Sequence, residues 1–112
     1  MKIFLFSLFI GLTSQTSFVK VLEKDNFQVL MQQESQVIDV RTPEEYALGY
    51  IEGAILIDYK AADFHASISA LNRNVTYLIY CRSGNRSGKA SIIMDSLGFK
   101  KIYDLKGGYM NW

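Results

Sequence analysis

The sequence contains only one cysteine, one histidine and one proline among its 112 residues. A single cysteine excludes an intramolecular disulfide framework and any zinc or iron–sulfur site built from several cysteines, and a single histidine excludes metal sites that need two. The formal net charge is +1, so no nucleic-acid partner is expected on electrostatic grounds. What is present is an ordinary globular composition, 49% hydrophobic, in a length that suits one domain.

The N-terminal segment has the composition of a targeting sequence. Lys2 precedes an apolar run at Ile3–Leu12, and a polar stretch of small residues follows at Thr13–Ser17. This order predicts a secretory signal peptide over residues 1–16, a domain over residues 17–112, and export to the periplasm or the exterior. The run is shorter than the ~20 apolar residues that cross a bilayer. A membrane partner is therefore expected only if the leader is retained as an anchor, and a buried first strand or helix is the other alternative.

Beyond this segment, short β-branched and aromatic runs alternate with amphipathic segments. We expect strands at Phe18–Leu22, Val37–Val40, Ala54–Ile57, Val75–Tyr80 and Lys101–Leu105. We expect helices that start at the capping residues Asp25, Thr42 and Asp63 and, after the fourth strand, at Arg86. The alternation predicts an α/β domain with a central, mainly parallel sheet and helices on both faces. Sites in such sheets form beyond the carboxyl ends of the strands.

The segment after the strongest predicted strand, Cys81–Gly88, contains the only thiol of the chain. It turns from a strand into a helix, and Arg82 and Arg86 follow the cysteine closely. Successive backbone N–H groups at such a turn form an anion cradle, and two cations with a helix dipole lower the pKa of a thiol. Cys81 is therefore a candidate nucleophile. The alternative is a small buried hydrophobic residue in a structural turn that carries two exposed arginines.

Four stretches give the chain a resemblance to a known family. They are VIDVRTPEEY (Val37–Tyr46), GYIEGAI (Gly49–Ile55), YCRSGNRS (Tyr80–Ser87) and YDLKGGYMNW (Tyr103–Trp112). In order and spacing the chain resembles a single-domain rhodanese, a rhodanese-like sulfurtransferase, from about Phe18 to the end. With its N-terminal segment it is similar to small periplasmic rhodaneses. The resemblance implies a rhodanese-like fold with a five-stranded parallel sheet and flanking helices.

The resemblance also implies an activity. Cys81 would accept a sulfane sulfur from a small anionic donor such as thiosulfate and become a persulfide. Cyanide or a thiol would then take the sulfur, in a two-step exchange through a covalent intermediate. A protein sulfur acceptor or a reducing partner is compatible with this chemistry, and no cofactor or metal is implied.

The same resemblance assigns the residues around the cysteine. The substrate-binding loop would consist of Arg82, Ser83, Gly84, Asn85 and Arg86. Its two arginines would bind the anionic donor, and its backbone amides would stabilise the charged sulfur. Asp39 and Arg41 match a family stretch near the site, where they either support the loop or form a structural ion pair.

Other functions remain open from the sequence. Related phosphatases and arsenate reductases place five residues between their cysteine and arginine, whereas four separate Cys81 from Arg86. The shorter cradle favours sulfur over a tetrahedral oxyanion, and the intact loop argues against a non-catalytic binding module. A single-thiol redox relay remains an alternative. Tyr50 replaces the histidine of the family's usual Gly-His-Ile stretch, a position that we expect to be structural. No motif links His65 to Cys81, so a cysteine–histidine protease is not indicated.

Overall fold

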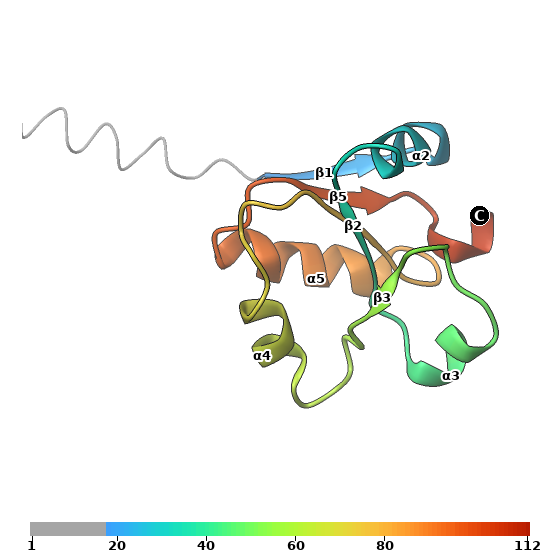
Figure 1. Ribbon diagram of the computed structural model, residues 1–112. Coiled ribbons are helices and arrows are strands. Elements are labelled where there is room, and N and C mark those ends of the chain that lie inside the picture. Colours follow the sequence, from blue (N-terminus) through green and yellow to red (C-terminus); the bar gives the residue numbers. More distant parts are fainter. Residues whose placement is uncertain (1–17) are drawn as a thin grey trace, which may run out of the picture.

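The computed structural model describes residues 18–112 and contains one sheet of five strands, all parallel (Figure 1). The strands are β1 (Val19–Leu22), β2 (Gln36–Asp39), β3 (Ile55–Leu56), β4 (Tyr77–Tyr80) and β5 (Ile102–Leu105), in the spatial order β1-β5-β4-β2-β3. The helices are α2 (Lys24–Met31), α3 (Pro43–Ala47), α4 (Phe64–Ser69), α5 (Asn85–Ser96) and a 3-10 turn, η1 (Gly108–Asn111). The predicted α/β class and its strand–helix alternation are confirmed.

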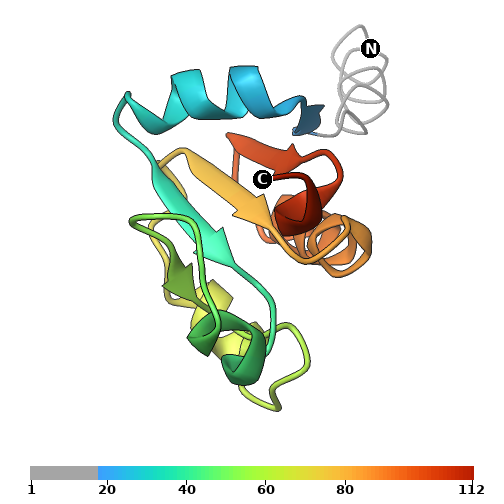
Figure 2. The same ribbon diagram turned by 90° about the vertical axis from the view of Figure 1, so that its right-hand side faces the viewer.

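Helices cover both faces of the sheet. Successive residues of each strand point to opposite faces and so pack against different helices. Figure 1 shows α2 above the sheet and α4 and α5 below it, and in Figure 2 α2 and α5 again lie on opposite sides of β5. The core on the α5 side includes Ile38, Val40, Ile79, Cys81, Ala90, Met94 and Ile102. The core on the α2 side includes Phe27, Val37, Leu78, Tyr80 and Leu105. Cys81 therefore lies on the face that α5 covers.

The predicted helix starts are only partly correct. The capping box at Thr42 is confirmed: its hydroxyl accepts from the Glu45 amide, and the Glu45 carboxylate accepts from the Thr42 amide. The capping box expected at Asp25 is wrong, because α2 begins at Lys24 directly after β1 and Asp25 lies inside its first turn. Asp63 does precede α4, but its side chain makes no capping hydrogen bond.

Several element boundaries also differ from the expectation; β4, for example, begins at Tyr77 rather than at Val75. The third strand is only Ile55–Leu56, although the amide of Ile57 still donates to the Asp39 carbonyl. This strand forms the edge of the sheet and has one pairing partner, β2, so little holds it in a longer ladder. Helix α5 begins at Asn85, one residue before the expected start, because Gly84 takes the N-cap position with a φ of 113°.

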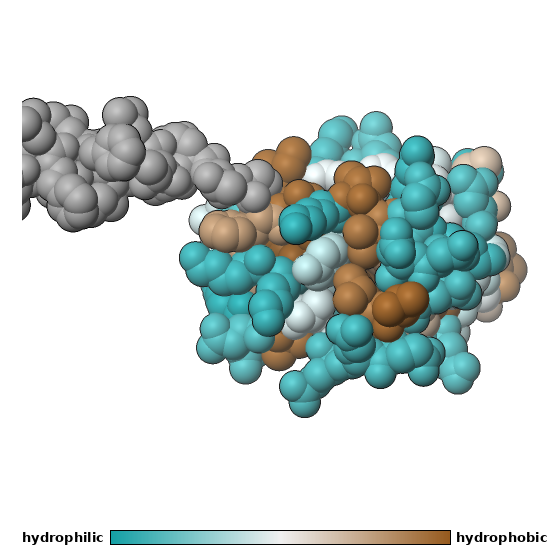
Figure 3. Space-filling view, turned by 90° about the horizontal axis from the view of Figure 1, so that it is seen from above, coloured by the Kyte–Doolittle hydropathy of each residue, from teal (hydrophilic) through white to brown (hydrophobic). Residues whose placement is uncertain are grey.

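The predicted signal peptide, residues 1–16, lies outside the residues that the structure describes. Within residues 18–112, no helix combines the length and the apolar character that a bilayer span requires. Large hydrophobic side chains are nevertheless exposed on β1 and α2, namely Val21 and Val29. Figure 3, a view from that side, shows such hydrophobic surface interspersed with hydrophilic side chains.

Candidate active site

The site is built at the carboxyl end of β4, where the chain leaves the sheet through Cys81. The Cys81 side chain is buried, and its Sγ accepts a hydrogen bond of 3.0 Å from the amide of Gly84. The thiol also contacts the Ser87 hydroxyl at 3.4 Å. Glycine at position 84 permits the positive φ that turns this amide toward the sulfur and starts α5. The loop thus wraps its N–H groups around one sulfur atom.

The pKa of the Cys81 thiol is lowered by this cradle. Burial alone would raise it, but hydrogen bonds from the Ser87 side chain and from the amides of Ser87, Gly84 and Ser83 outweigh that effect. The predicted direction is therefore confirmed. The strongest stabilising contacts come from Ser87 and the amides at the start of α5. The arginines contribute less to the lowered pKa of Cys81, and Arg86 interacts with the sulfur only through charge.

The loop rests on the turn η1, which is far away in the sequence. The amide of Tyr109 donates to the Cys81 carbonyl at 2.8 Å, and the amide of Met110 donates to the Arg82 carbonyl at 3.0 Å. A Cβ atom on Gly108 would lie 2.5 Å from the Arg82 carbonyl oxygen, and the φ of this glycine is +62°. Only glycine permits this approach. The sequence alone predicts no role for Gly108 at the loop, and its only local signal is the adjacent pair Gly107-Gly108.

The structure brings the other predicted loop residues together in two different ways. Arg82, Ser83 and Asn85 are exposed around the cradle. Arg86 instead forms a bidentate ion pair with Glu45 of α3: Nη1 donates to Oε1 at 2.7 Å and Nη2 donates to Oε2 at 3.0 Å. That hydrogen-bonded pair raises the pKa of Arg86 and lowers the pKa of Glu45 to about 2. The sequence alone predicts Glu45 only as a member of the Thr42 capping box and gives no sign of its pairing with Arg86.

Asp39 and Arg41, predicted as supporting residues, form a buried network at the end of β2. The Arg41 guanidinium donates to both Asp39 carboxylate oxygens, at 3.0 Å from Nε and 2.7 Å from Nη2. It also donates to the Gly49 carbonyl and lies over the ring of Tyr109, 4.4 Å from its centroid. The Tyr80 hydroxyl donates to Asp39 at 2.6 Å. The network therefore connects β2, β4 and η1 beneath the loop.

A pocket of about 260 Å³ adjoins the loop. It is lined by Arg41, Glu45, Leu48, Gly49, Arg82, Tyr109 and Met110. Arg82 is exposed and makes no ion pair within residues 18–112, so it suits an anion, whereas Arg41 is paired with Asp39. The exposed side chains of Leu48 and Met110 add apolar surface at the rim. Tyr50, in the position of the family histidine, is half exposed and stacks on Tyr46 rather than on any loop residue.

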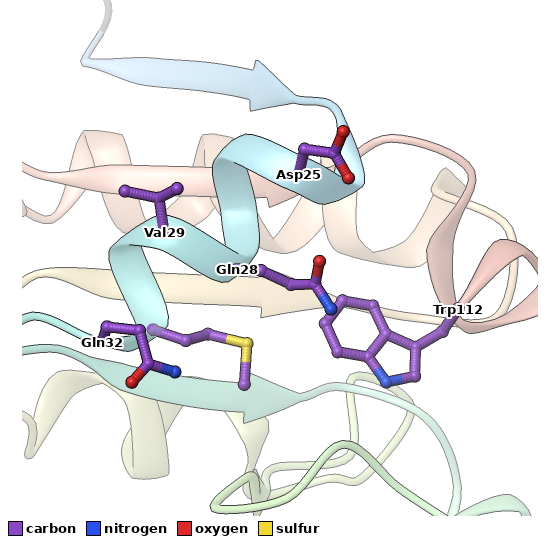
Figure 4. Close-up of a pocket in the computed structure, with 6 residues that line it drawn as sticks. Asp25, Gln28, Val29, Gln32 and Trp112 are labelled. Carbon is purple, nitrogen blue, oxygen red and sulfur yellow. The ribbon is translucent and has the colours of Figure 1, made fainter.

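A larger hollow of about 510 Å³ lies elsewhere, between α2 and Trp112 (Figure 4). Its lining comprises Asp25, Gln28, Val29, Met31, Gln32 and Trp112. None of these side chains is an activated nucleophile, and Cys81 does not line it. Among the described residues, no three His, Cys, Asp or Glu side chains are grouped to hold a metal ion. The chemistry of residues 18–112 therefore concentrates at the cradle of Cys81.

Comparison with known proteins agrees with this geometry. The sequence matches the Rhodanese-like domain family over residues 22–112. It is 33% identical to thiosulfate sulfurtransferase GlpE of Pseudomonas fluorescens over 94 residues, 83% of this chain and 84% of that protein. It is 37% identical to thiosulfate sulfurtransferase GlpE of Pseudomonas paraeruginosa over 79 residues, 70% of this chain and 69% of that protein.

Solved structures give the same result. The rhodanese-like domain protein of Staphylococcus aureus superposes with a TM-score of 0.73 at 30% identity, covering 83% of this chain and 90% of that one. The human single-domain sulfurtransferase TSTD1 superposes with a TM-score of 0.68 at 26% identity, covering 82% and 93%. The order of the strands, the cradle around one cysteine and these similarities together show that the chain belongs to the rhodanese-like domain family.

Proposed function

We propose that the protein is a sulfurtransferase, which moves a sulfane sulfur from an anionic donor such as thiosulfate to cyanide or a thiol through a persulfide on Cys81. The observation that carries this proposal is the geometry at Sγ. A thiol of lowered pKa receives a backbone amide at 3.0 Å in a loop with four residues between Cys81 and Arg86. Such a loop stabilises one anionic sulfur better than a tetrahedral oxyanion.

The first half-reaction loads the cysteine. The Cys81 thiolate attacks the outer sulfur of thiosulfate, the sulfur–sulfur bond of thiosulfate breaks, and sulfite leaves with the electron pair of that bond. The negative charge then resides on the outer sulfur of the persulfide, where loop amides such as that of Gly84 can stabilise it. Arg82 is exposed and lines the adjoining pocket, and in this proposal it attracts the sulfonate end of the donor.

The second half-reaction transfers the outer sulfur of the Cys81 persulfide to the acceptor. Cyanide or a thiolate attacks the outer sulfur, the persulfide bond breaks, and the Cys81 thiolate is regenerated with its electron pair. The acceptor approaches from the pocket beside the loop, whose rim combines Arg82 with apolar side chains such as Met110. An organic thiol with an acidic group would fit this combination of charge and apolar surface.

The test is to incubate the protein with thiosulfate and to measure the intact mass and the thiocyanate formed from cyanide. We expect a gain of one sulfur atom on Cys81 and steady thiocyanate production. Cys81→Ser should abolish both. As a matched variant in the same loop, Arg82→Gln should still form the persulfide, with a KM for thiosulfate raised about three- to tenfold and kcat within about twofold.

Three outcomes would contradict the proposal. One is the absence of any sulfur adduct on a folded protein whose thiol still reacts with iodoacetamide. The second is robust hydrolysis of p-nitrophenyl phosphate by the wild-type chain, which would show that the short loop accommodates a tetrahedral oxyanion after all. The third is binding of a partner protein that survives Cys81→Ser, without any sulfur transfer, which would point to a binding module.

A further inference from the structure

A second acidic side chain is buried close to the cysteine and has no part in the reaction described above. Asp104, on β5, is 5% exposed. Its Oδ1 is one of two buried side-chain polar atoms within residues 18–112 that lack a hydrogen-bond partner, and the other is Ser91 Oγ. No ion pair involves this carboxyl among the described residues. A buried ionised carboxyl without a cation is energetically costly, so burial favours the protonated form of Asp104.

The sheet register places Asp104 on the same face as the cysteine. Asp104 pairs with Ile79 of β4, and Cys81 lies two residues beyond Ile79, so both side chains point toward α5. Helix α5 passes close by: a Cβ atom on Gly88 would lie 3.9 Å from Asp104 Oδ2. The residue before that glycine is Ser87, whose hydroxyl contacts the Cys81 sulfur at 3.4 Å.

Ser87 also acts on the carboxyl. Burial raises the pKa of Asp104 to about 6, and the Ser87 side chain, which lies near the carboxyl without a hydrogen bond of standard geometry in this structure, lowers it in part. Helix α5 also buries Ser91, one turn after Ser87. Strand β4 contributes Cys81, and β1 pairs Val21 with Asp104. The charged side chains of these elements make no ion pair with Asp104; they are Lys20, Arg86, Lys89 and Asp95. The carboxyl is therefore free to gain or lose a proton near neutral pH.

We propose that Asp104 is a positioning residue that sets the protonation of Cys81 through the Ser87 hydroxyl, and this inference rests on the proposed role of Cys81 as the nucleophile. A serine hydroxyl has one proton to donate. When Asp104 is protonated, it donates to Ser87 Oγ, and the Ser87 proton points to the sulfur, which favours the thiolate. When Asp104 is ionised, it attracts the Ser87 proton, and the thiol donates to Ser87 Oγ instead.

The two arrangements differ in the position of one proton, which is either on the Cys81 sulfur or on the Asp104 carboxyl. No electrons are gained or lost. As the thiol ionises, its proton passes to Ser87 Oγ while the Ser87 proton passes to the Asp104 carboxylate. The proton released by Cys81 is thus held inside the protein, and the thiolate is ready for a donor. Groups coupled in this way titrate as a pair, so the ionisation of the thiol should extend over two steps.

The test follows the rate of alkylation of Cys81 by iodoacetamide against pH, which requires no sulfur donor. The wild type should show a broad, two-step profile. In Asp104→Asn the side-chain amide donates permanently to Ser87, so the profile should become a single step with its midpoint lowered by about half a unit to one unit. At mildly alkaline pH, below the wild-type midpoint, this shift makes alkylation about three- to tenfold faster.

Ser87→Ala removes the connection. Its profile should be a single step at higher pH, because the thiolate loses a donor, and adding Asp104→Asn to it should change the midpoint little. Asp63→Asn, which removes an exposed carboxylate, is the matched control and should reproduce the wild type. A two-step profile that persists in Asp104→Asn, or an effect of Asp104→Asn that is equally large in Ser87→Ala, would overturn the proposal.

A second measurement does not depend on the folding of the Asp104 variant. Carboxyl carbon NMR of the otherwise unmodified protein should show Asp104 titrating near neutral pH, and Ser87→Ala should raise that midpoint further. An unchanged Asp104 midpoint in Ser87→Ala would contradict the connection. Because neither experiment involves thiosulfate, failure of sulfur transfer alone would count against the proposed function and leave the coupling of Asp104 to Cys81 intact.

Discussion

The two most buried carboxyl groups near the site, Asp39 and Asp104, have opposite surroundings. Asp39 is fully buried and accepts hydrogen bonds from the Arg41 guanidinium, the Arg41 amide and the Tyr80 hydroxyl. Asp104 is almost as buried, yet it has no cation, and Oδ1 has no partner within the described chain. The Asp39 carboxyl is held by a cation and a hydroxyl donor, whereas Asp104 has neither a cation nor a hydrogen-bond partner for Oδ1 among the described residues.

This difference suits the two carboxyl groups to different roles: Asp39 holds its neighbours in position, and Asp104 can exchange a proton. The charge of Asp39 organises its neighbours: Arg41 reaches on to the Gly49 carbonyl, and Tyr80 receives the amide of Ile51. A network of this kind determines a geometry. Asp104 retains a proton equilibrium in that range, next to the serine that contacts Cys81. Strongly perturbed pKa values cluster at functional sites.

The largest effect is expected from removing the cation beside Asp39. Arg41→Met leaves a buried carboxylate without a partner and should lower the free energy of unfolding by about 3–5 kcal/mol. Urea denaturation measures it. Lys106→Met, which breaks the exposed pair of Lys106 with Glu23, is the matched control and should cost less than about 1 kcal/mol. Similar losses in both variants would show that the buried network is no more important than a surface pair.

Asp104 should give an effect of the opposite sign. Its pKa is raised from 3.8 to about 6 in the folded protein, so between these values the folded state binds more protons than the unfolded state. Stability should therefore fall by about 2–3 kcal/mol as pH rises from about 4 to about 7. Asp104→Asn should flatten this dependence and stabilise the protein at neutral pH. A wild type whose stability does not fall over that range would remove the contrast with Asp39.

The Tyr80 hydroxyl tests how much a neutral member of the Asp39 network contributes. Tyr80→Phe removes the donor to Asp39 and leaves the buried amide of Ile51 without its acceptor, so we expect a loss of about 1–3 kcal/mol in urea denaturation. Tyr77→Phe is the control: Tyr77 is also buried, but its hydroxyl bonds only to the Asn72 carbonyl, and the loss should be smaller. An equal loss in both variants would show no special role for Asp39.

The sequence predicted what local patterns determine. The strand–helix alternation, the Thr42 capping box and the cysteine at the end of a buried strand all follow from short-range residue preferences, and the structure bears them out. The Asp25 cap failed because two side chains of suitable type and spacing do not determine where a helix enters from the preceding strand. The burial of Phe27 against the sheet helps fix that point.

The rest of the site depends on contacts that no local pattern reveals. Gly108 touches the Arg82 carbonyl only because β5 and its following turn lie beside β4. Asp104 looks like an ordinary strand-end aspartate until the register places it on the α5 face. Arg86 was predicted as a donor-binding arginine, but its partner Glu45 lies 41 residues earlier in the chain. Tertiary packing determines each of these three environments.

The smallest effect on stability is expected for a third carboxyl, Glu45, which has a cationic partner as Asp39 does but is less buried than either aspartate. Its ion pair with Arg86 is partly exposed and screened by solvent, so Glu45→Gln should cost only about 0.5–1 kcal/mol, less than the full shift of the Glu45 pKa would correspond to. The Arg86 hydrogen bond lowers the pKa of Glu45 from 4.5 to about 2, so this contribution is complete above about pH 4.5 and is lost as the pH falls toward 2. The variant should lack that acid-dependent part of the stability curve, which urea denaturation between neutral and acidic pH would detect.

Glu45→Gln should also affect the reaction, in the direction opposite to its effect on stability. It removes a negative charge from the lining of the pocket beside the loop and frees the Arg86 guanidinium, which is charge-coupled to Cys81. We therefore expect the KM for thiosulfate to fall about two- to threefold at low salt and the effect to shrink as ionic strength rises. Glu44→Gln, one residue earlier on an exposed position of α3, should leave the KM unchanged. A higher KM in Glu45→Gln would mean that the ion pair orients Arg86 for the donor, and Glu45 would then resemble Asp39 as a support rather than a restraint.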